Sequence, residues 1–145
     1  MCGLRTHNLR LITHSCMSKL LALDIGTRRT GVAYADTVSG IVMALETIKH
    51  SSDDELTRHI ATLVKKMQIS ELIIGLPKLL DGSEGKQSLL VRSAAQSIVD
   101  VVHLPLKFVD ERFTSGKRGD KSSDKDARAA CAILTVVIDQ RRNQY

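Results

Sequence analysis

The sequence has few of the side chains that build several common kinds of site. It has no Trp, and aromatic residues make up only 3% of the chain, so a surface that binds nucleic acid mainly by stacking bases on aromatic rings is not expected. No apolar run reaches the ~18 residues that a membrane-spanning helix needs. The three Cys and five His residues show neither a CxxC motif nor zinc-ligand spacing. We therefore expect a reduced, cytoplasmic protein with no membrane association and no zinc site.

The remaining composition is that of an ordinary globular chain. A length of 145 residues predicts one domain, and 43% hydrophobic residues can form a stable core without disulfides. Residues 1–16 differ from the rest because they hold Arg, Thr, His and Asn without a sustained hydrophobic period. We interpret residues 1–16 as a disordered extension, with Met17 as an alternative start, and residues 17–145 as the folded domain.

Hydrophobic periodicity predicts an α/β domain with three strands followed by alternating helices and strands. The strands are expected at 19–25, 31–36, 41–48, 72–77 and 104–109, and the helices at 56–67, 89–102 and 124–142. Gly26 and Gly40 lie at short connections and predict an antiparallel meander. Ser52 and Glu55 form a capping box for the first helix. The order βββαβαβα predicts a mixed five-stranded sheet flanked by helices.

Acidic residues stand at the ends of three predicted elements. Asp24 ends the first strand, Asp110 and Glu111 end the last strand, and Asp126 opens the final helix. Carboxylates gathered in one place repel each other unless a cation lies between them, and oxygen ligands suit Mg²⁺ or Mn²⁺. These acids therefore predict a divalent-metal site, where two ions could activate water and stabilise a leaving oxygen. The alternative is that each acid merely ends its element.

Basic residues are concentrated in the segment that follows Asp110 and Glu111. The chain carries a net charge of +5, which is a mild bias toward polyanions. The cations that follow Glu111, in the loop and the start of the final helix, are Arg112, Lys117, Arg118, Lys121, Lys125 and Arg128. A basic rim beside an acidic centre suits a phosphodiester substrate, although a solvated polar loop would have the same composition.

Four stretches of the chain match, in order, the motifs of one known family. Residues 24–33, DIGTRRTGVA, match D-x-G-x-x-R-x-G-V-A, and residues 74–85 contain IGLP followed by DGSEG. Residues 109–115, VDERFTS, match V-D-E-R-x-T-S, and residues 126–134 match the helix motif D-x-x-A-A-x-x-I-L. Over residues 18–140 the chain thus resembles the YqgF family of bacterial RNase H-like proteins, described as Holliday junction resolvases or pre-16S rRNA nucleases.

The resemblance implies an RNase H-like fold and metal-dependent hydrolysis of phosphodiester bonds. It implies that Asp24, Glu111 and Asp126 are the catalytic residues and the ligands of Mg²⁺ or Mn²⁺. Strand alternation puts Asp110 and Glu111 on opposite faces, so only one of them is expected to point into the site, and Asp110 stays an alternative to Glu111.

Several basic residues and glycines near these acids are further candidates. The expected substrate-binding residues are Arg29 and Arg112, because Arg presents a bidentate fork to phosphate, together with Lys117 and Arg118 of the basic loop. For the two arginines, pairing with the neighbouring acids is the alternative. Gly26 and Gly31 are expected to let the backbone turn tightly, near the substrate or in an ordinary hairpin. The segment 116–125 is shorter than in the family and lacks an apolar face, which leaves the substrate preference open.

Three readings of the function remain after this comparison. We expect a cytoplasmic nuclease, a monomer or weak homodimer, that processes the 5′ end of pre-16S rRNA. A resolvase-like nuclease acting on branched DNA is the first alternative, and it would need two opposed active sites. A nucleic-acid-binding module without catalysis is the second. An actin-like ATPase or sugar kinase is disfavoured, because such proteins need two domains of this kind around a nucleotide.

Overall fold

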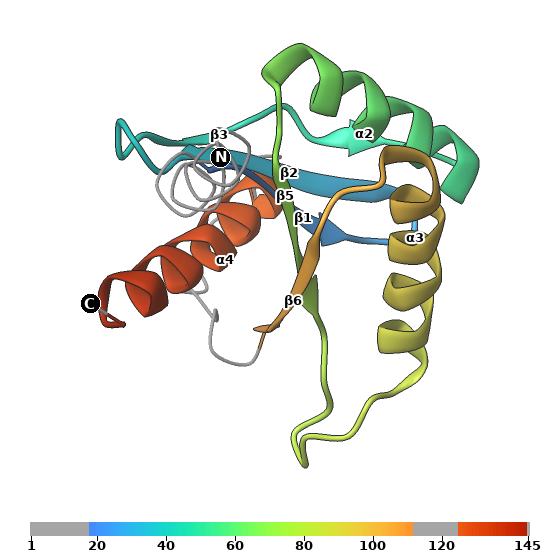
Figure 1. Ribbon diagram of the computed structural model, residues 1–145. Coiled ribbons are helices and arrows are strands. Elements are labelled where there is room, and N and C mark those ends of the chain that lie inside the picture. Colours follow the sequence, from blue (N-terminus) through green and yellow to red (C-terminus); the bar gives the residue numbers. More distant parts are fainter. Residues whose placement is uncertain (1–17, 112–124, 145) are drawn as a thin grey trace, which may run out of the picture.

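The structure, a computed structural model, describes residues 18–111 and 125–144 (Figure 1). The strands are β1 (Lys19–Ile25), β2 (Arg29–Asp36), β3 (Val42–Ala44), β4 (Ile48–Lys49), β5 (Glu71–Leu76) and β6 (Leu106–Asp110). The helices are α2 (Asp53–Met67), α3 (Lys86–Val102) and α4 (Lys125–Arg142). None of these helices is long and apolar enough to span a membrane. The predicted extension at 1–16 lies outside the described residues.

The strands form one mixed sheet in the order β3-β2-β1-β5-β6, with β4 also paired to β2. Strand β1 is antiparallel to β2 and parallel to β5, and β5 is parallel to β6. The predicted α/β class is confirmed, and the predicted order of elements holds except at the third strand. The single strand expected at 41–48 is instead two short strands, so the sheet has six strands rather than five. Three residues, 45–47, stand opposite only two in β2, and this bulge interrupts the ladder.

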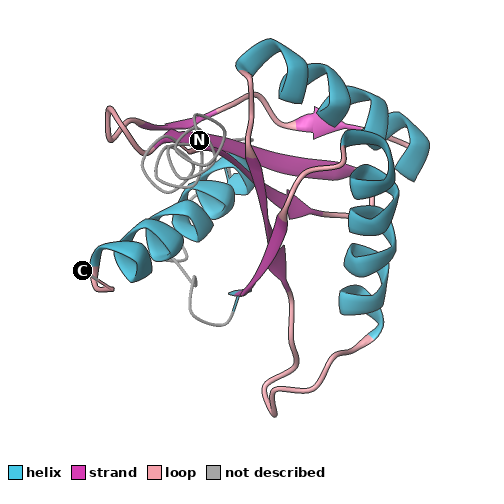
Figure 2. Cartoon of the chain, in the orientation of Figure 1, coloured by secondary structure: helices cyan, strands magenta, loops and turns pink. Residues whose placement is uncertain are grey.

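Each face of the sheet packs against its own helices. Helices α2 and α3 cover one face and α4 covers the other (Figures 1 and 2). In β1, Leu21 and Leu23 belong to the apolar cluster under α2 and α3, whereas Leu20 and Ala22 belong to the cluster under α4. Because side chains alternate along a strand, Asp24 continues the series of Leu20 and Ala22 and lies on the α4 face.

The first described helix begins at the predicted capping box. The Ser52 hydroxyl oxygen accepts a hydrogen bond from the Glu55 N–H at 3.2 Å. The Glu55 carboxylate in turn accepts from the N–H of Ser51 at 2.9 Å and from its hydroxyl at 2.8 Å. The return arm of the box therefore reaches Ser51 rather than Ser52, and helix α2 begins where the sequence predicts.

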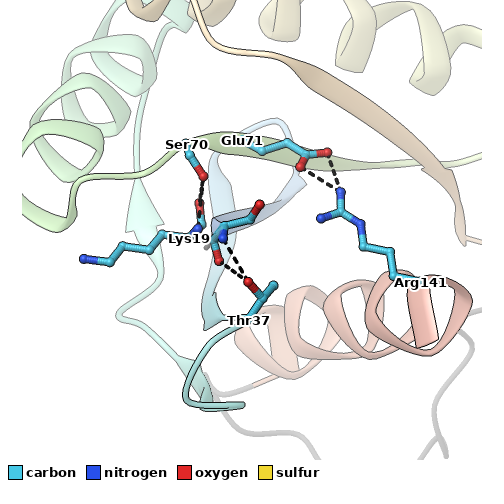
Figure 3. A network of polar contacts seen from close by, with 6 residues as sticks. Lys19, Thr37, Ser70, Glu71 and Arg141 are labelled. Atoms are coloured by element: carbon cyan, nitrogen blue, oxygen red, sulfur yellow. Dashed lines mark hydrogen bonds and ion pairs between the residues drawn. The ribbon is translucent and has the colours of Figure 1, made fainter. Parts of the chain in front are cut away.

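Polar contacts fix the end of the sheet opposite Asp24, as Figure 3 shows. The Lys19 N–H donates to the Ser70 hydroxyl at 3.0 Å, and that hydroxyl donates back to the Lys19 carbonyl at 3.1 Å. Arg141 donates to both oxygens of Glu71 at 2.7 Å. These contacts join the last turns of α4 to the start of β5, so the first turn of α4 lies toward the Asp24 end of the sheet.

Candidate functional site

Two glycines flank Asp24 on the α4 face of the sheet. Gly31 in β2 is the register partner of Asp24. Gly75 in β5 follows directly after Ile74, which is the partner of Leu23, so it lies on the other side of Asp24. Asp24 thus stands between two positions without side chains, and neighbouring groups can approach it closely.

The absence of a side chain at Gly75 gives Glu111 access to Asp24. Strand β5 lies between β1 and β6, so the tips of the strands that carry the two acids are not direct neighbours. A Cβ atom at Gly75 would lie 2.6 Å from the Glu111 Oε1 atom. The Glu111 side chain therefore crosses over the Gly75 backbone, and it makes a side-chain hydrogen bond with Asp24.

The hydrogen bond between the Asp24 and Glu111 carboxyl groups favours one proton between them. Burial, the hydrogen bond to Asp24 and the negative charge of Asp24 raise the pKa of Glu111 to about 8. Burial also raises the pKa of Asp24, and the negative charge of Asp126 raises it further. The hydrogen bond with Glu111 lowers the pKa of Asp24, but by less. In this hydrogen bond Glu111 is the donor and Asp24 the acceptor, because the contact raises the pKa of Glu111 and lowers that of Asp24. A pair of carboxyl groups that holds a proton in this way could exchange it for a cation.

Asp126 approaches the pair from helix α4. A Cβ atom at Gly31 would overlap the backbone of Asp126, so the first turn of α4 rests directly on β2 at that glycine. The expectation that Gly31 forms a turn is wrong, since it lies inside β2 and its role is this close approach. Gly26 does form the turn between β1 and β2, where its N–H donates to the Arg29 carbonyl at 2.9 Å.

Arg29 lies beside the acids rather than apart from them. Its Nε atom is 3.7 Å from the Asp126 Oδ2 atom, and both side chains are partly exposed. The ion pair that was the alternative to phosphate contact is therefore present. An exposed pair of this kind is worth little to stability, and its arginine can exchange the carboxylate for a phosphate.

The structure separates Asp110 from Glu111. Val109 packs in the cluster under α4, whereas Phe108 packs against the cluster under α2 and α3. By alternation, Glu111 lies on the α4 face with Asp24 and Asp110 lies on the opposite side of the strand. Of the two adjacent acids, Glu111 is therefore the one that joins Asp24.

The donor atoms of the site are all carboxylate oxygens, which is the ligand type that Mg²⁺ and Mn²⁺ prefer. Within residues 18–111 and 125–144, no three Asp, Glu, His or Cys side chains are grouped closely enough to hold a metal ion. Two acids meet, and Asp126 acts on Asp24 through its charge. Arg112, Lys117 and Arg118, and the shortened segment before Lys125, lie outside the described residues.

The sheet order and flanking helices are those of the RNase H-like class. The structure is similar to that of RuvC from T. thermophilus in complex with a Holliday junction substrate, with a TM-score of 0.63 and 12% sequence identity. The similarity covers 86% of this chain and 96% of that one. At this identity the similarity shows the fold, and the predicted RNase H-like fold is confirmed.

Sequence comparison defines the family. The profile of RuvX, described as "Holliday junction resolvase", matches residues 18–140, so the chain belongs to the RuvX family, which is also called YqgF. A Dictyoglomus turgidum protein is 31% identical over 132 residues, covering 83% of this chain and 94% of its own length. A Crocosphaera subtropica protein is 35% identical over 133 residues, covering 84% and 93%. Both are named "Putative pre-16S rRNA nuclease".

These descriptions agree on the class of enzyme. Resolvases and rRNA nucleases both hydrolyse phosphodiester bonds of nucleic acids, so the expected membership of this family and the expected nuclease activity are confirmed. Two glycines, Gly31 and Gly75, bring the acids together; sequence reasoning gave Gly31 the wrong role and missed Gly75. Their signal was present, since each interrupts a strand pattern, and a glycine inside a strand often marks a close approach.

Proposed function

We propose that the protein is a divalent-metal-dependent nuclease that processes the 5′ end of pre-16S rRNA, with Asp24, Glu111 and Asp126 as its catalytic acids and metal ligands. The observation that carries the proposal is the partly buried Asp24–Glu111 pair, which the gap at Gly75 brings into hydrogen-bond contact where two charges would repel each other. Such a pair, with the Asp126 charge nearby, favours a cation over a proton.

Each acid has a defined part in this site. Strand β1 holds Asp24 rigidly at the centre, the gap at Gly75 admits Glu111, and the contact at Gly31 sets the position of Asp126. Mg²⁺ or Mn²⁺, as two ions, would supply an activated water and stabilise the leaving oxygen. Arg29, which already contacts a carboxylate, would bind the substrate phosphate, together with Arg112, Lys117 and Arg118.

The preference for an RNA precursor rests on the names of the relatives. The description of the family profile supports branched DNA as the second candidate substrate, and that reaction requires two opposed sites and hence a dimer. For RNA processing one site suffices, so we propose a cytoplasmic monomer or weak homodimer with a single domain from 17 to 145.

The test is cleavage of a labelled RNA that carries the 5′ precursor end of 16S rRNA, with Mg²⁺ or Mn²⁺, by wild type and Asp24→Asn. The control is Asp36→Asn at the end of β2, where Asn keeps the oxygen that accepts from the Val38 N–H at 2.8 Å. We expect metal-dependent cleavage by the wild type and by Asp36→Asn, and none by Asp24→Asn. Calorimetric titration with Mn²⁺ should show weaker binding only in Asp24→Asn.

Other outcomes separate the alternatives. Cleavage of a four-way DNA junction but not of the RNA would favour the resolvase. Salt-sensitive binding of RNA without cleavage by any variant would favour a binding module. Cleavage by Asp24→Asn at the wild-type rate would refute the role given to the acids.

A further inference from the structure

A cationic groove runs from the candidate site toward α2. It is formed by the turn between β1 and β2 and by β4, with a volume of about 650 Å³, and its lining includes Thr27, Arg28, Arg29, Lys49 and His50. Because Arg29 also contacts Asp126 at 3.7 Å, the groove begins beside the acids. Its residues come from two segments, 27–29 and 49–55, which are some 20 residues apart in the sequence.

The pairing of β2 with β4 places two positive charges directly opposite each other. Arg29 and Lys49 are register partners in this antiparallel ladder, so their side chains leave the same face a short distance apart, where like charges are unfavourable. Arg28 lines the same groove. The carboxylate at its far end, Glu55, already accepts two hydrogen bonds from Ser51. An anion between Arg29 and Lys49 would relieve their repulsion.

A buried histidine in the lining has an unused polar atom. The side chain of His50 is 7% exposed, and its Nε2 atom is 2.9 Å from the Thr30 hydroxyl oxygen. Its Nδ1 atom is buried and has no hydrogen-bond partner within residues 18–111 and 125–144. Buried polar atoms are almost always paired, so a small movement of the ring at the groove wall would let this nitrogen bind a ligand.

A second hollow of about 720 Å³ adjoins the groove at Lys49, which lines both. Its apolar lining comes from Leu45, Ile48, Leu63 and Met67, and its charged residues are Lys49, Lys66 and one acid, Glu46. An apolar hollow with a basic rim suits a planar base attached to an anionic backbone. A base can enter such a hollow only when it is neither paired nor stacked in a duplex.

We propose that the groove of Arg28, Arg29, Lys49 and His50 binds phosphates of a single-stranded segment of the substrate next to the scissile bond, and that the adjoining hollow accommodates an unpaired base of that segment. The proposal deepens the proposed function, because Arg29 connects the groove to the acids. The proposed ligand is a single-stranded polynucleotide whose successive phosphates contact the basic residues of the groove.

The test measures binding without cleavage. Fluorescence anisotropy in EDTA gives the Kd of a labelled single-stranded RNA for wild type, for the Arg28→Gln/Lys49→Gln variant, and for the control Lys65→Gln/Arg142→Gln. The control removes the same charge from exposed positions that line neither hollow. We expect binding roughly 100-fold weaker in the groove variant, tenfold for each lost phosphate contact. The slope of log K against log salt should become shallower by about 1.4. The control should change Kd by less than about threefold.

Two further measurements test the histidine and the requirement for a single strand. Nitrogen NMR signals of the His50 ring should shift when a short oligouridylate is added, while those of His103 should not. The groove variant should lose less affinity for a fully paired RNA duplex than for the single strand. Equal losses for both, or unmoved His50 signals, would overturn the corresponding part of the proposal.

Failure of this proposal and failure of the proposed function give different results. If the groove variant binds single strands like wild type while Asp24→Asn still abolishes cleavage, the groove proposal is wrong and the nuclease stands. If no protein cleaves RNA but the groove variant alone loses binding, the nuclease assignment is wrong and the groove stands.

Discussion

A methyl group at Gly75 should disrupt the site through two side chains. In Gly75→Ala, the new Cβ would lie 2.6 Å from the Glu111 Oε1 atom, 3.0 Å from Glu111 Cγ, and 2.6 Å from the Ile133 Cδ1 atom. Carbon atoms do not approach other heavy atoms this closely, so both side chains must move. Glu111 would then lose its position across β5 and its hydrogen bond with Asp24.

The magnitudes follow from the crowding. Overpacking of this kind costs about 1–3 kcal/mol, which for a domain of this size lowers Tm by roughly 3–9 °C. Cleavage should fall about 100-fold or more, because a displacement of about 1 Å at a catalytic group has an effect of that order.

Differential scanning fluorimetry and the RNA cleavage assay measure the two effects. Gly85→Ala is the matched control, since its nearest contact would be the flexible Leu79 side chain at 3.3 Å. In Gly75→Ala/Ile133→Val the crowding Cδ1 atom is removed, so stability should recover in part while cleavage stays low. An unchanged Tm and an unchanged rate in Gly75→Ala would refute the path of Glu111 over β5.

Three other predictions follow. Glu111→Gln should abolish cleavage while Asp110→Asn retains it, because only Glu111 lies on the face of Asp24; single-turnover rates measure this. Gly31→Ala should destabilise the protein more than Gly75→Ala in urea unfolding, since its Cβ would overlap the backbone of Asp126 and not a movable side chain. In EDTA, the difference in free energy of unfolding between wild type and Glu111→Gln should fall by about 1–2 kcal/mol as pH rises from 4.5 to about 8, because Glu111 keeps its proton longer in the folded state than in the unfolded chain. Taking the difference cancels the opposite slope from His50, whose pKa is lowered by burial.

Local patterns predicted most of the elements. The alternation in β1, the helical spacing of α2 after its capping box and the apolar face of α4 each depend on residues close in sequence, and the structure has these elements at the expected places. The motifs also picked out Asp24, Glu111 and Asp126. The prediction of a single strand at 41–48 was wrong, because the bulge at 45–47 depends on pairing with β2. No local hydrophobic period reveals that pairing.

The sequence by itself therefore determined the α/β class, the family and the acidic residues. The tertiary structure decided how those acids meet: strand order put β5 between them, and Gly75 and Gly31 left room for a side chain and for a helix backbone. It also decided that Arg29 and Lys49 stand opposite each other. The physical reason is that hydrophobic periodicity is set within a few residues, whereas strand order and close approach depend on packing between distant segments of the chain.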